Sequence, residues 1–324
     1  MCGFTGYANF IDKIHHSKSV IQQMNSKLSK RGPDEDGYYY SDYVHLAHKR
    51  LIVIDPKGGK QPMIEHYSYG DYIICYNGQL YNTKELKNIL IENGFEIKTH
   101  SDTEILLKSY IHFGNSVVNY LNGIFAFAIF NTKKEELFIA RDHFGVKPFF
   151  YTIQNNTFIF ASEIKAIFKF PGVEKIIDSQ GISELFGIGP SHTSGTTVFK
   201  NIFELKPAHF GVFNKSGLHL TKYWSLKSKE HTDSLGKTCE KIKYLLNDSI
   251  TSQLVSDKPI CTFLSGGLDS SIITKFAADY YEKEGLPPLD TYSIDYVDND
   301  KNFVKSDFQP NSDNYYIDLM TKNL

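Results

Sequence analysis

The sequence has few cysteines and no long apolar run. The four cysteines, Cys2, Cys75, Cys239 and Cys261, lie far apart and form no Cys-x-x-Cys pair. This spacing excludes the usual zinc-finger pattern and offers no disulfide framework. Scattered cysteines are typical of a reducing compartment, so we expect a cytoplasmic location. The longest apolar run, Ile124 to Phe130, is far too short to span a bilayer, and the first residues lack the basic and apolar segments of a secretory signal.

An excess of charge of one sign is also absent. Lys plus Arg is 35 and Asp plus Glu is 37, which gives a net charge of −2. That balance gives no electrostatic reason to expect a nucleic-acid or membrane partner. Trp occurs once, but hydrophobic residues make up 41% and aromatic residues 14% of the chain, which is enough for folded cores and argues against disorder. At about 150 residues per domain, the length predicts two domains.

The first two-thirds of the sequence is predicted to be rich in strands. The turn signals Asn77-Gly78, Asn131-Thr132 and Asn155-Asn156 separate short apolar or alternating runs. These predicted strands are residues 72–76, 124–130, 137–140, 149–153 and 157–161. Helical spacing predicts helices over 83–93 and 102–113, the second opened by a Ser101-x-x-Glu104 capping box. Hairpins with a few helices favour two packed sheets with helices outside them.

The pattern changes after residue 224. Residues 225–237 are polar and without periodicity, so we place a domain linker there. An amphipathic helix is predicted over 238–255 and a buried strand over 259–264. A glycine-containing loop follows, then a helix from about 272 to 284 and a strand starting at Thr291. This order is typical of the beginning of a parallel α/β sheet.

The second residue of the chain is a candidate nucleophile. Removal of Met1 would make Cys2 the N-terminal residue. Its free α-amino group, with a pKa of about 8, would then take the thiol proton directly or through a water, with no catalytic His required. On its own, a cysteine at position 2 is more often a structural accident than a nucleophile, so the rest of the sequence has to decide.

Several short blocks that follow Cys2 decide this question. They are Cys2-Gly3-Phe4-Thr5-Gly6, Arg31-Gly32-Pro33-Asp34, His48 to Asp55 with Arg50, Tyr76-Asn77-Gly78-Gln79-Leu80-Tyr81-Asn82, and Ser101-Asp102-Thr103-Glu104. In this order they resemble the N-terminal-nucleophile glutamine amidotransferases. The second and third blocks resemble the asparagine synthetase branch, since sugar-phosphate amidotransferases would have Tyr in place of Pro33. The segments 141–148 and 160–166 match the same branch and receive no chemical role; Arg141-Asp142 is interpreted as an ion pair or a turn.

The resemblance implies a fold and a mechanism for residues 2–224. The fold is a four-layer sandwich of two stacked sheets with outer helices. Cys2 attacks the side-chain amide of glutamine, and the Asn77 side chain and the Gly78 N–H form the oxyanion hole. A glycine at position 78 allows a close backbone approach. The products are ammonia and glutamate.

Glutamine-binding residues are also implied by the resemblance. Arg50 would hold the substrate α-carboxylate and Asp102 the α-ammonium, alongside Asn77 and Gly78. The family usually has Glu at position 79; Gln79 accepts a hydrogen bond there but carries no charge. Read singly, each residue has a plainer interpretation: Asn77-Gly78 as a hairpin turn, Asp102 as part of a helix start, and Arg50 as a surface cation.

The loop from Ser265 to Ser271 is a candidate phosphate-binding site. Its glycines and hydroxyls lie between a strand and a helix N-terminus, which suits an anion, but it lacks the lysine of a P-loop. It resembles the pyrophosphate loop of ATP pyrophosphatases, in which Asp269 would help to hold Mg²⁺. The implied ATP-binding residues are Leu264, Ser265, Gly266, Gly267, Asp269, Ser270 and Ile294. The plainer interpretation is a turn in which Asp269 and Ser270 cap the helix.

Together the two halves resemble the glutamine-hydrolysing asparagine synthetases, which are ligases. The resemblance implies that ammonia attacks β-aspartyl-AMP, made from aspartate and Mg²⁺-ATP, to give asparagine, AMP and pyrophosphate. The substrates are then glutamine, ATP and aspartate; a homodimer is compatible with the family, and no prosthetic group is expected. Related β-lactam-forming synthetases typically lack the N-terminal cysteine, so Cys2 argues against them.

The synthetase half is shorter here than the resemblance requires. The second loop, Ser-Gly-Glu-Gly-x-Asp-Glu, and a downstream lysine have no counterpart. Residues 238–324 are therefore expected to be a partial ATP-binding domain of a truncated chain. Two alternatives remain: a stand-alone glutaminase and an inactive regulatory fragment. We expect the chain as given to release ammonia from glutamine but not to make asparagine alone.

Overall fold

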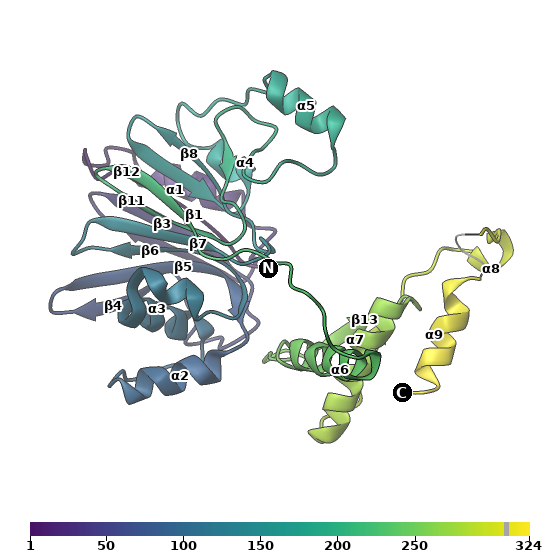
Figure 1. The fold of residues 1–324 in the computed structure, drawn as a ribbon. Coiled ribbons are helices and arrows are strands. Elements are labelled where there is room, and N and C mark those ends of the chain that lie inside the picture. The colour runs from purple at the N-terminus through teal and green to yellow at the C-terminus, as the bar shows by residue number, and fades with distance from the viewer. Residues whose placement is uncertain (308–310) are drawn as a thin grey trace. The chain divides into compact units, whose positions relative to one another are not determined.

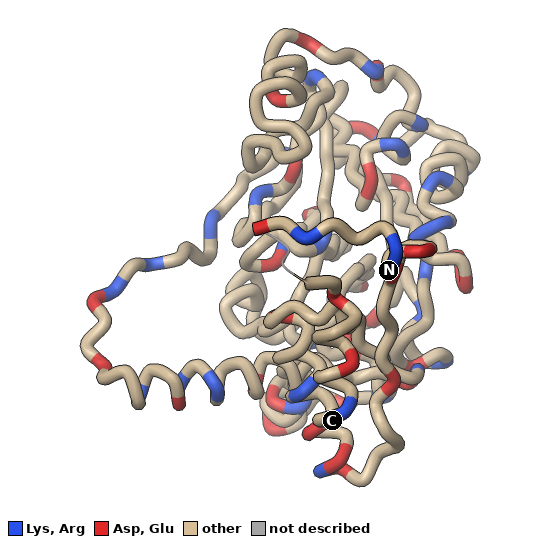
Figure 2. The backbone as a smooth tube through the Cα atoms, turned by 90° about the vertical axis from the view of Figure 1, so that its right-hand side faces the viewer, with Lys and Arg blue, Asp and Glu red and all other residues tan. Residues whose placement is uncertain are grey.

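A computed structural model describes residues 1–307 and 311–324 of the chain. The chain divides into two compact units, Met1–Ser228 and Lys229–Leu324 (Figure 1). The division lies within the stretch predicted as a linker, although its residues 235–237 belong to helix α6, Leu235–Thr251. Acidic and basic residues are interspersed along the backbone, as Figure 2 shows. No helix in the described ranges is long and apolar enough to cross a membrane.

Unit 1 contains two six-stranded sheets in which every neighbouring pair of strands is antiparallel. The first sheet, in spatial order, is β10 Phe203–Glu204, β8 Phe150–Gln154, β9 Thr157–Ala161, β1 Gly3–Ala8, β3 Val44–Arg50 and β2 Glu35–Tyr40. The second is β12 Gly217–Lys222, β11 His209–Asn214, β7 Glu136–Arg141, β6 Gly123–Asn131, β5 Gly70–Leu80 and β4 Met63–Tyr67.

Three hydrophobic cores hold unit 1 together as four layers. Side chains of both sheets, including Phe4, Phe130 and Phe160, form the central core. Helices α1 Lys18–Ser26 and α4 Ile164–Ile167 pack on the outer face of the first sheet. The outer face of the second sheet is covered by α2 Thr83–Glu92, α3 Asp102–Phe113 and the 3₁₀ helix η1 Gly114–Asn119, while α5 Ser179–Gly187 follows α4. The predicted sandwich of two sheets between outer helices is confirmed.

The interpretation of Asn77-Gly78 as a turn is wrong. Both residues lie inside β5, where Asn77 pairs with Ala126 and Gly78 pairs with Phe125 of β6. A Cβ atom on Gly78 would lie 2.3 Å from the carbonyl oxygen of Ile124. The glycine is therefore required by the close approach of two strands, and the strand continues where the local signal predicts that it ends.

The capping box predicted before α3 forms only in part. The Ser101 hydroxyl accepts a hydrogen bond from the Thr103 N–H, as expected of an N-cap. The Glu104 carboxylate does not return to the Ser101 N–H. It accepts hydrogen bonds from the Thr99 N–H and hydroxyl and pairs with Lys108 at 2.5 Å. The Glu104 carboxylate therefore binds the preceding turn and the buried Lys108 ammonium instead of closing the capping box.

Unit 2 contains a short parallel sheet, as predicted. Strands β13 Cys261–Phe263 and β14 Asp290–Tyr292 pair in parallel and are connected by α7 Leu268–Lys283. Helix α7 begins earlier than predicted because Gly267 is its N-cap, and α6 ends at Thr251 rather than 255. Helices α8 Asn299–Asn302 and α9 Asp313–Thr321 follow.

Candidate active site

A cavity of about 240 Å³ in unit 1 brings together all the residues predicted for glutamine chemistry. They are Cys2, Arg50, Asn77, Gly78, Gln79 and Asp102. Three of them come from β5 of the second sheet. The others come from the residue before β1, the end of β3 and the first residue of α3. Both sheets and one outer helix therefore contribute to a single site.

The Cys2 thiol lies against the backbone of Leu51, just after β3. The Leu51 N–H donates to Sγ at 3.4 Å, and Sγ lies 3.6 Å from the Leu51 carbonyl oxygen. Burial raises the pKa of the Cys2 thiol, while the Leu51 N–H and the nearby N-terminus and Arg50 act to lower it. Because burial dominates, this thiol needs a nearby base or cation to become a thiolate.

Asn77 lines the cavity and carries an unused hydrogen-bond donor. The residue is 2% exposed, and its Nδ2 has no hydrogen-bond partner in the described part of the chain. A buried, unsatisfied amide donor carries a free-energy cost of about 1–3 kcal/mol. An unsatisfied buried donor of this kind calls for an explanation, and a substrate oxygen that accepts from it would provide one.

Asp102 is held as a partly buried acceptor at the start of α3. Its Oδ2 accepts from the Tyr76 hydroxyl at 2.8 Å and from the Leu80 N–H at 3.2 Å. Burial raises the pKa of the Asp102 carboxyl, and these hydrogen bonds oppose the rise. The helix N-terminus also favours the carboxylate. This group can therefore present negative charge to a cationic ligand in the cavity.

The Arg50 guanidinium is engaged with the protein itself. Nη1 donates to the Glu35 carboxylate at 2.8 Å and to the Pro56 carbonyl at 3.0 Å. Nη2 donates to the carbonyls of Ile54 at 3.1 Å and Asp55 at 2.6 Å. Arg50 therefore organises the 54–56 turn at the edge of the cavity. Its predicted contact with a substrate carboxylate stays a prediction.

Sequence reasoning missed other residues on the cavity wall. Gln61 accepts from the Tyr76 N–H at 2.6 Å and donates to the Thr103 hydroxyl at 3.3 Å, which ties β5 to α3. Lys147, in the loop between β7 and β8, also lines the cavity. Lys147 lies in the 141–148 segment that received no chemical role; a lysine between a valine and a proline carries no local signal of a site.

The predicted phosphate loop in unit 2 lies between β13 and α7. The hydroxyls of Ser265 and Ser270 are 3.0 Å apart, and Gly266 has φ +80°, which favours glycine. Asp269 lies in the first turn of α7. Among the described residues, no group of three or more His, Cys, Asp or Glu side chains gathers around a metal-sized site.

The two residues predicted to flank adenosine differ in burial. Leu264 is 1% exposed, and its N–H donates to the Tyr292 carbonyl at 2.9 Å, at the ends of the two parallel strands. Ile294 is 82% exposed. Leu264 is therefore a buried residue that ties the start of the loop to β14, whereas Ile294 presents an apolar side chain at the surface of unit 2.

Comparisons with known proteins agree with the division of the chain into two units. Residues 1–224 match the family "Glutamine amidotransferase domain" and residues 241–324 match "Asparagine synthase". The chain is 50% identical to asparagine synthetase [glutamine-hydrolyzing] 3 of Bacillus subtilis, covering 99% of this chain and 52% of the relative. It is 35% identical to the putative asparagine synthetase 2 of Methanocaldococcus jannaschii, covering 91% and 59%. The chain thus spans about half the length of the curated relatives it matches.

One solved structure supports the fold at low sequence identity. The glutamine phosphoribosylpyrophosphate amidotransferase from B. subtilis, complexed with ADP and GMP, has a TM-score of 0.50 and 17% identity. The similarity covers 94% of this chain and 69% of that one. It confirms the sandwich of two antiparallel sheets.

Proposed function

Because the chain belongs to the glutamine amidotransferase family, we propose that unit 1 hydrolyses glutamine to glutamate and ammonia with Cys2 as the nucleophile. The observation that carries this proposal is that Asn77, whose Nδ2 has no hydrogen-bond partner among the described residues, lines the same cavity as Cys2 and Asp102. A thiol, an unused amide donor and a partly buried carboxylate are the groups needed to attack, stabilise and hold an amide substrate that carries an α-ammonium.

The reaction is proposed to begin with proton transfer. Once Met1 is removed, the α-amine of Cys2 takes the thiol proton, and Sγ attacks the side-chain carbonyl carbon of glutamine. Charge develops on the carbonyl oxygen, which accepts hydrogen bonds from Asn77 Nδ2 and the Gly78 N–H. The amine returns the proton to the departing nitrogen, so ammonia leaves and a thioester remains. Water then hydrolyses the thioester, which releases glutamate and restores the thiol.

The remaining cavity residues are proposed to bind the glutamine main-chain groups. Asp102, fixed by Tyr76 and Leu80, attracts the α-ammonium. Arg50 holds the 54–56 turn and, with it, provides the positive side of the site for the α-carboxylate. Gln79 lines the same cavity and supplies an uncharged acceptor.

Unit 2 is proposed to serve asparagine synthesis in the whole protein. The loop from Ser265 to Ser271 would bind the phosphates of ATP at the start of α7. Asp269 would share Mg²⁺ with those phosphates, and Leu264 and Ile294 would flank the adenosine. Aspartate would be activated as β-aspartyl-AMP and attacked by ammonia from unit 1. The match of residues 241–324 to the asparagine synthase family supports this assignment.

The proposed function is tested by following products from isotopically labelled glutamine. The purified chain with Met1 removed is expected to release glutamate and ammonia in equal amounts, and to act far more slowly on asparagine, whose side chain is one methylene shorter. No glutamate release above a no-enzyme control would contradict the proposal. Equal rates on glutamine and asparagine would contradict the proposal that Asp102 binds the α-ammonium of the substrate.

Gln79→Glu is expected to lower the KM for glutamine with little change in kcat. The added carboxylate would attract the α-ammonium equally in the ground state and the transition state, so it adds uniform binding. A charged hydrogen bond of this kind contributes about 1.5–3 kcal/mol. Steady-state kinetics check the prediction, with Gln61→Glu as the control that places a charge elsewhere on the wall. An unchanged or higher KM for Gln79→Glu would contradict it.

A further inference from the structure

Lys147 is a buried cation next to the candidate nucleophile. Its side chain lines the cavity that contains Cys2, and the residue is only 8% exposed. Its Nζ lies 3.3 Å from the Sδ of Met1, and no carboxylate of the described residues is within ion-pairing distance. A buried ammonium without a counter-charge is costly, so its retention calls for a reason.

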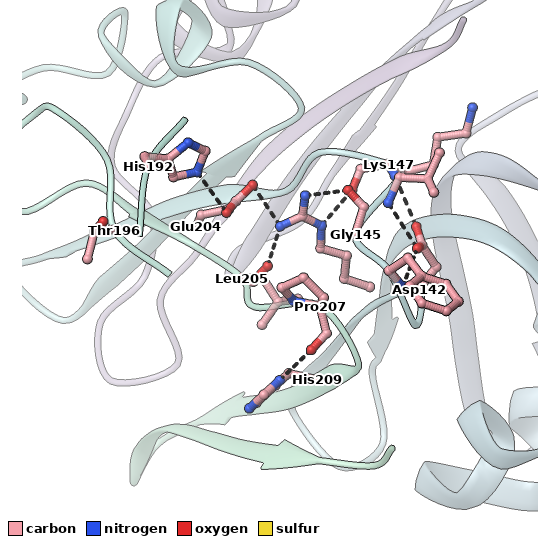
Figure 3. Close-up of polar contacts among 12 residues, drawn as sticks. Asp142, Gly145, Lys147, His192, Thr196, Glu204, Leu205, Pro207 and His209 are labelled. Atoms are coloured by element: carbon pink, nitrogen blue, oxygen red, sulfur yellow. Dashed lines mark hydrogen bonds and ion pairs between the residues drawn. The ribbon is translucent and has the colours of Figure 1, made fainter. Parts of the chain in front are cut away.

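The backbone on both sides of Lys147 is firmly held. The Asp142 carboxylate accepts hydrogen bonds from the Phe144 N–H at 3.1 Å, the Val146 N–H at 2.9 Å and the Lys147 N–H at 3.0 Å. The Lys147 carbonyl accepts from Arg141 Nε at 2.7 Å. Figure 3 shows Lys147 and Asp142 side by side in this loop. Of the two interpretations of Arg141-Asp142, the turn is confirmed. Among the described residues Arg141 pairs with Glu204 rather than with Asp142, and the Asp142 carboxylate holds the backbone that leads to Lys147.

The Arg141 side chain makes further contacts that hold this loop in place. Arg141 donates to the carbonyls of Gly145 and Leu205, each at 2.6 Å, and pairs with Glu204 at 2.8 Å. Glu204 also lies 3.1 Å from His192 Nε2 (Figure 3). The network, in which Arg141 and Glu204 are buried, joins the β7–β8 loop to β10. The backbone position of Lys147 is thus fixed by contacts that do not involve its own side chain.

Other charged groups near Cys2 are already paired within the protein. They are Arg31 with Glu163 at 3.2 Å, Arg50 with Glu35 at 2.8 Å, Asp102 with the Tyr76 hydroxyl at 2.8 Å, and Asp34 with the Ile52 N–H at 2.8 Å. Arg31 and Asp34 lie in the segment that joins α1 to β2, Arg50 lies at the end of β3, and Asp102 lies at the start of α3. Lys147 differs from the two arginines because its charge has no carboxylate partner among the described residues.

Building on the proposed function, we propose that Lys147 is a positioning residue whose ammonium prepares Cys2 for ionisation: it keeps the α-amine neutral, and so able to take the thiol proton, and it stabilises the thiolate that results. A cation nearby stabilises a thiolate and destabilises a protonated amine. Removal of Met1 takes away the contact of Nζ with Sδ and leaves the ammonium beside the new N-terminus. In the present chain the pKa of the Met1 amine is lowered by burial first, and then by Arg31 and Lys147.

The proposal is tested by the pH dependence of Cys2 alkylation. The full chain with Met1 removed is treated with iodoacetamide, and modification of the Cys2 peptide is followed by mass spectrometry. Lys147→Met, which retains an apolar stem of similar length, is compared with Lys147→Arg. The exposed Cys239 serves as an internal reference in every sample.

Lys147→Met is expected to move the Cys2 alkylation profile upward by about one pH unit and to slow alkylation at pH 7 about five- to tenfold. The Cys239 rate should not change, and Lys147→Arg should restore the Cys2 profile. An unmoved profile in Lys147→Met, or an equal displacement in Lys147→Arg, would overturn the proposal. If Lys147→Met does not fold, Lys147→Gln takes its place under the same criteria.

Alkylation requires no glutamine turnover, so it decides the role of Lys147 separately from the proposed function. Failure of the unaltered chain to hydrolyse glutamine would refute the proposed function and leave the alkylation result standing. Where turnover is present, the acid limb of kcat/KM should rise by the same one pH unit in Lys147→Met. A purely structural role for Lys147 would lower the rate at every pH and leave that limb in place.

Discussion

Cys2→Ala is expected to reduce glutamine hydrolysis by at least about 10³-fold, which is the scale on which nucleophile deletions act. The alanine chain keeps its α-amine and its oxyanion-hole donors but has no atom that can form the thioester. Because Cys2 lies before β1 and outside the three hydrophobic cores, its truncation should leave folding intact. The measurement is glutamate release at saturating glutamine.

The matched control is Cys239→Ala. Cys239 is exposed on α6 in unit 2, and its loss should leave the glutaminase rate unchanged. The thermal unfolding midpoints of both variants should stay close to that of the unaltered chain. Hydrolysis by Cys2→Ala at the rate of the unaltered chain would show that another group attacks the substrate.

Asn77→Ala is expected to lower kcat for glutamine hydrolysis about 10²- to 10³-fold, with little change in KM, since an oxyanion-hole donor acts on charge that develops in the transition state. Its effect on stability should be small. The Nδ2 donor has no partner in the described part of the chain, so its removal breaks no hydrogen bond and relieves the cost of an unsatisfied group. Kinetics and thermal unfolding together distinguish this result from a folding defect.

Asn131→Ala provides the opposite pattern as a control. Asn131 is also 2% exposed, but its Oδ1 accepts from the Lys133 and Lys134 N–H groups at 3.1 and 3.2 Å. Its loss should reduce stability by about 1–3 kcal/mol and leave kcat nearly unchanged. A kcat for Asn77→Ala within threefold of the unaltered value would contradict the assignment of its donor to the oxyanion.

Apolar alternation and helical spacing were sufficient to predict much of unit 1. The runs at 124–130 and 157–161 coincide with β6 and β9, and the parallel order of β13 and β14 follows from a strand, a glycine loop and a helix. The Asn77-Gly78 pair misled because a turn signal is local, whereas the closeness of Gly78 to Ile124 depends on pairing with a distant strand.

The site was predictable in its residues and less so in its contacts. Motif resemblance identified Cys2, Asn77 and Asp102, which line one cavity. Sequence gave no indication that Arg50 donates to the 54–56 turn or that Lys147 lies beside Met1. Such contacts depend on how loops fold over the ends of the sheets, and no spacing in the sequence encodes them.

The central claim is that Cys2 acts through its own free α-amine. The most direct measurement compares glutamine hydrolysis by two forms of the same chain, one with Met1 removed and one with Met1 retained and blocked by an N-terminal extension. Mass spectrometry establishes the N-terminus of each form. Our account predicts turnover only in the form that begins at Cys2, because an amide nitrogen cannot accept the thiol proton. Equal turnover by the blocked form would contradict it.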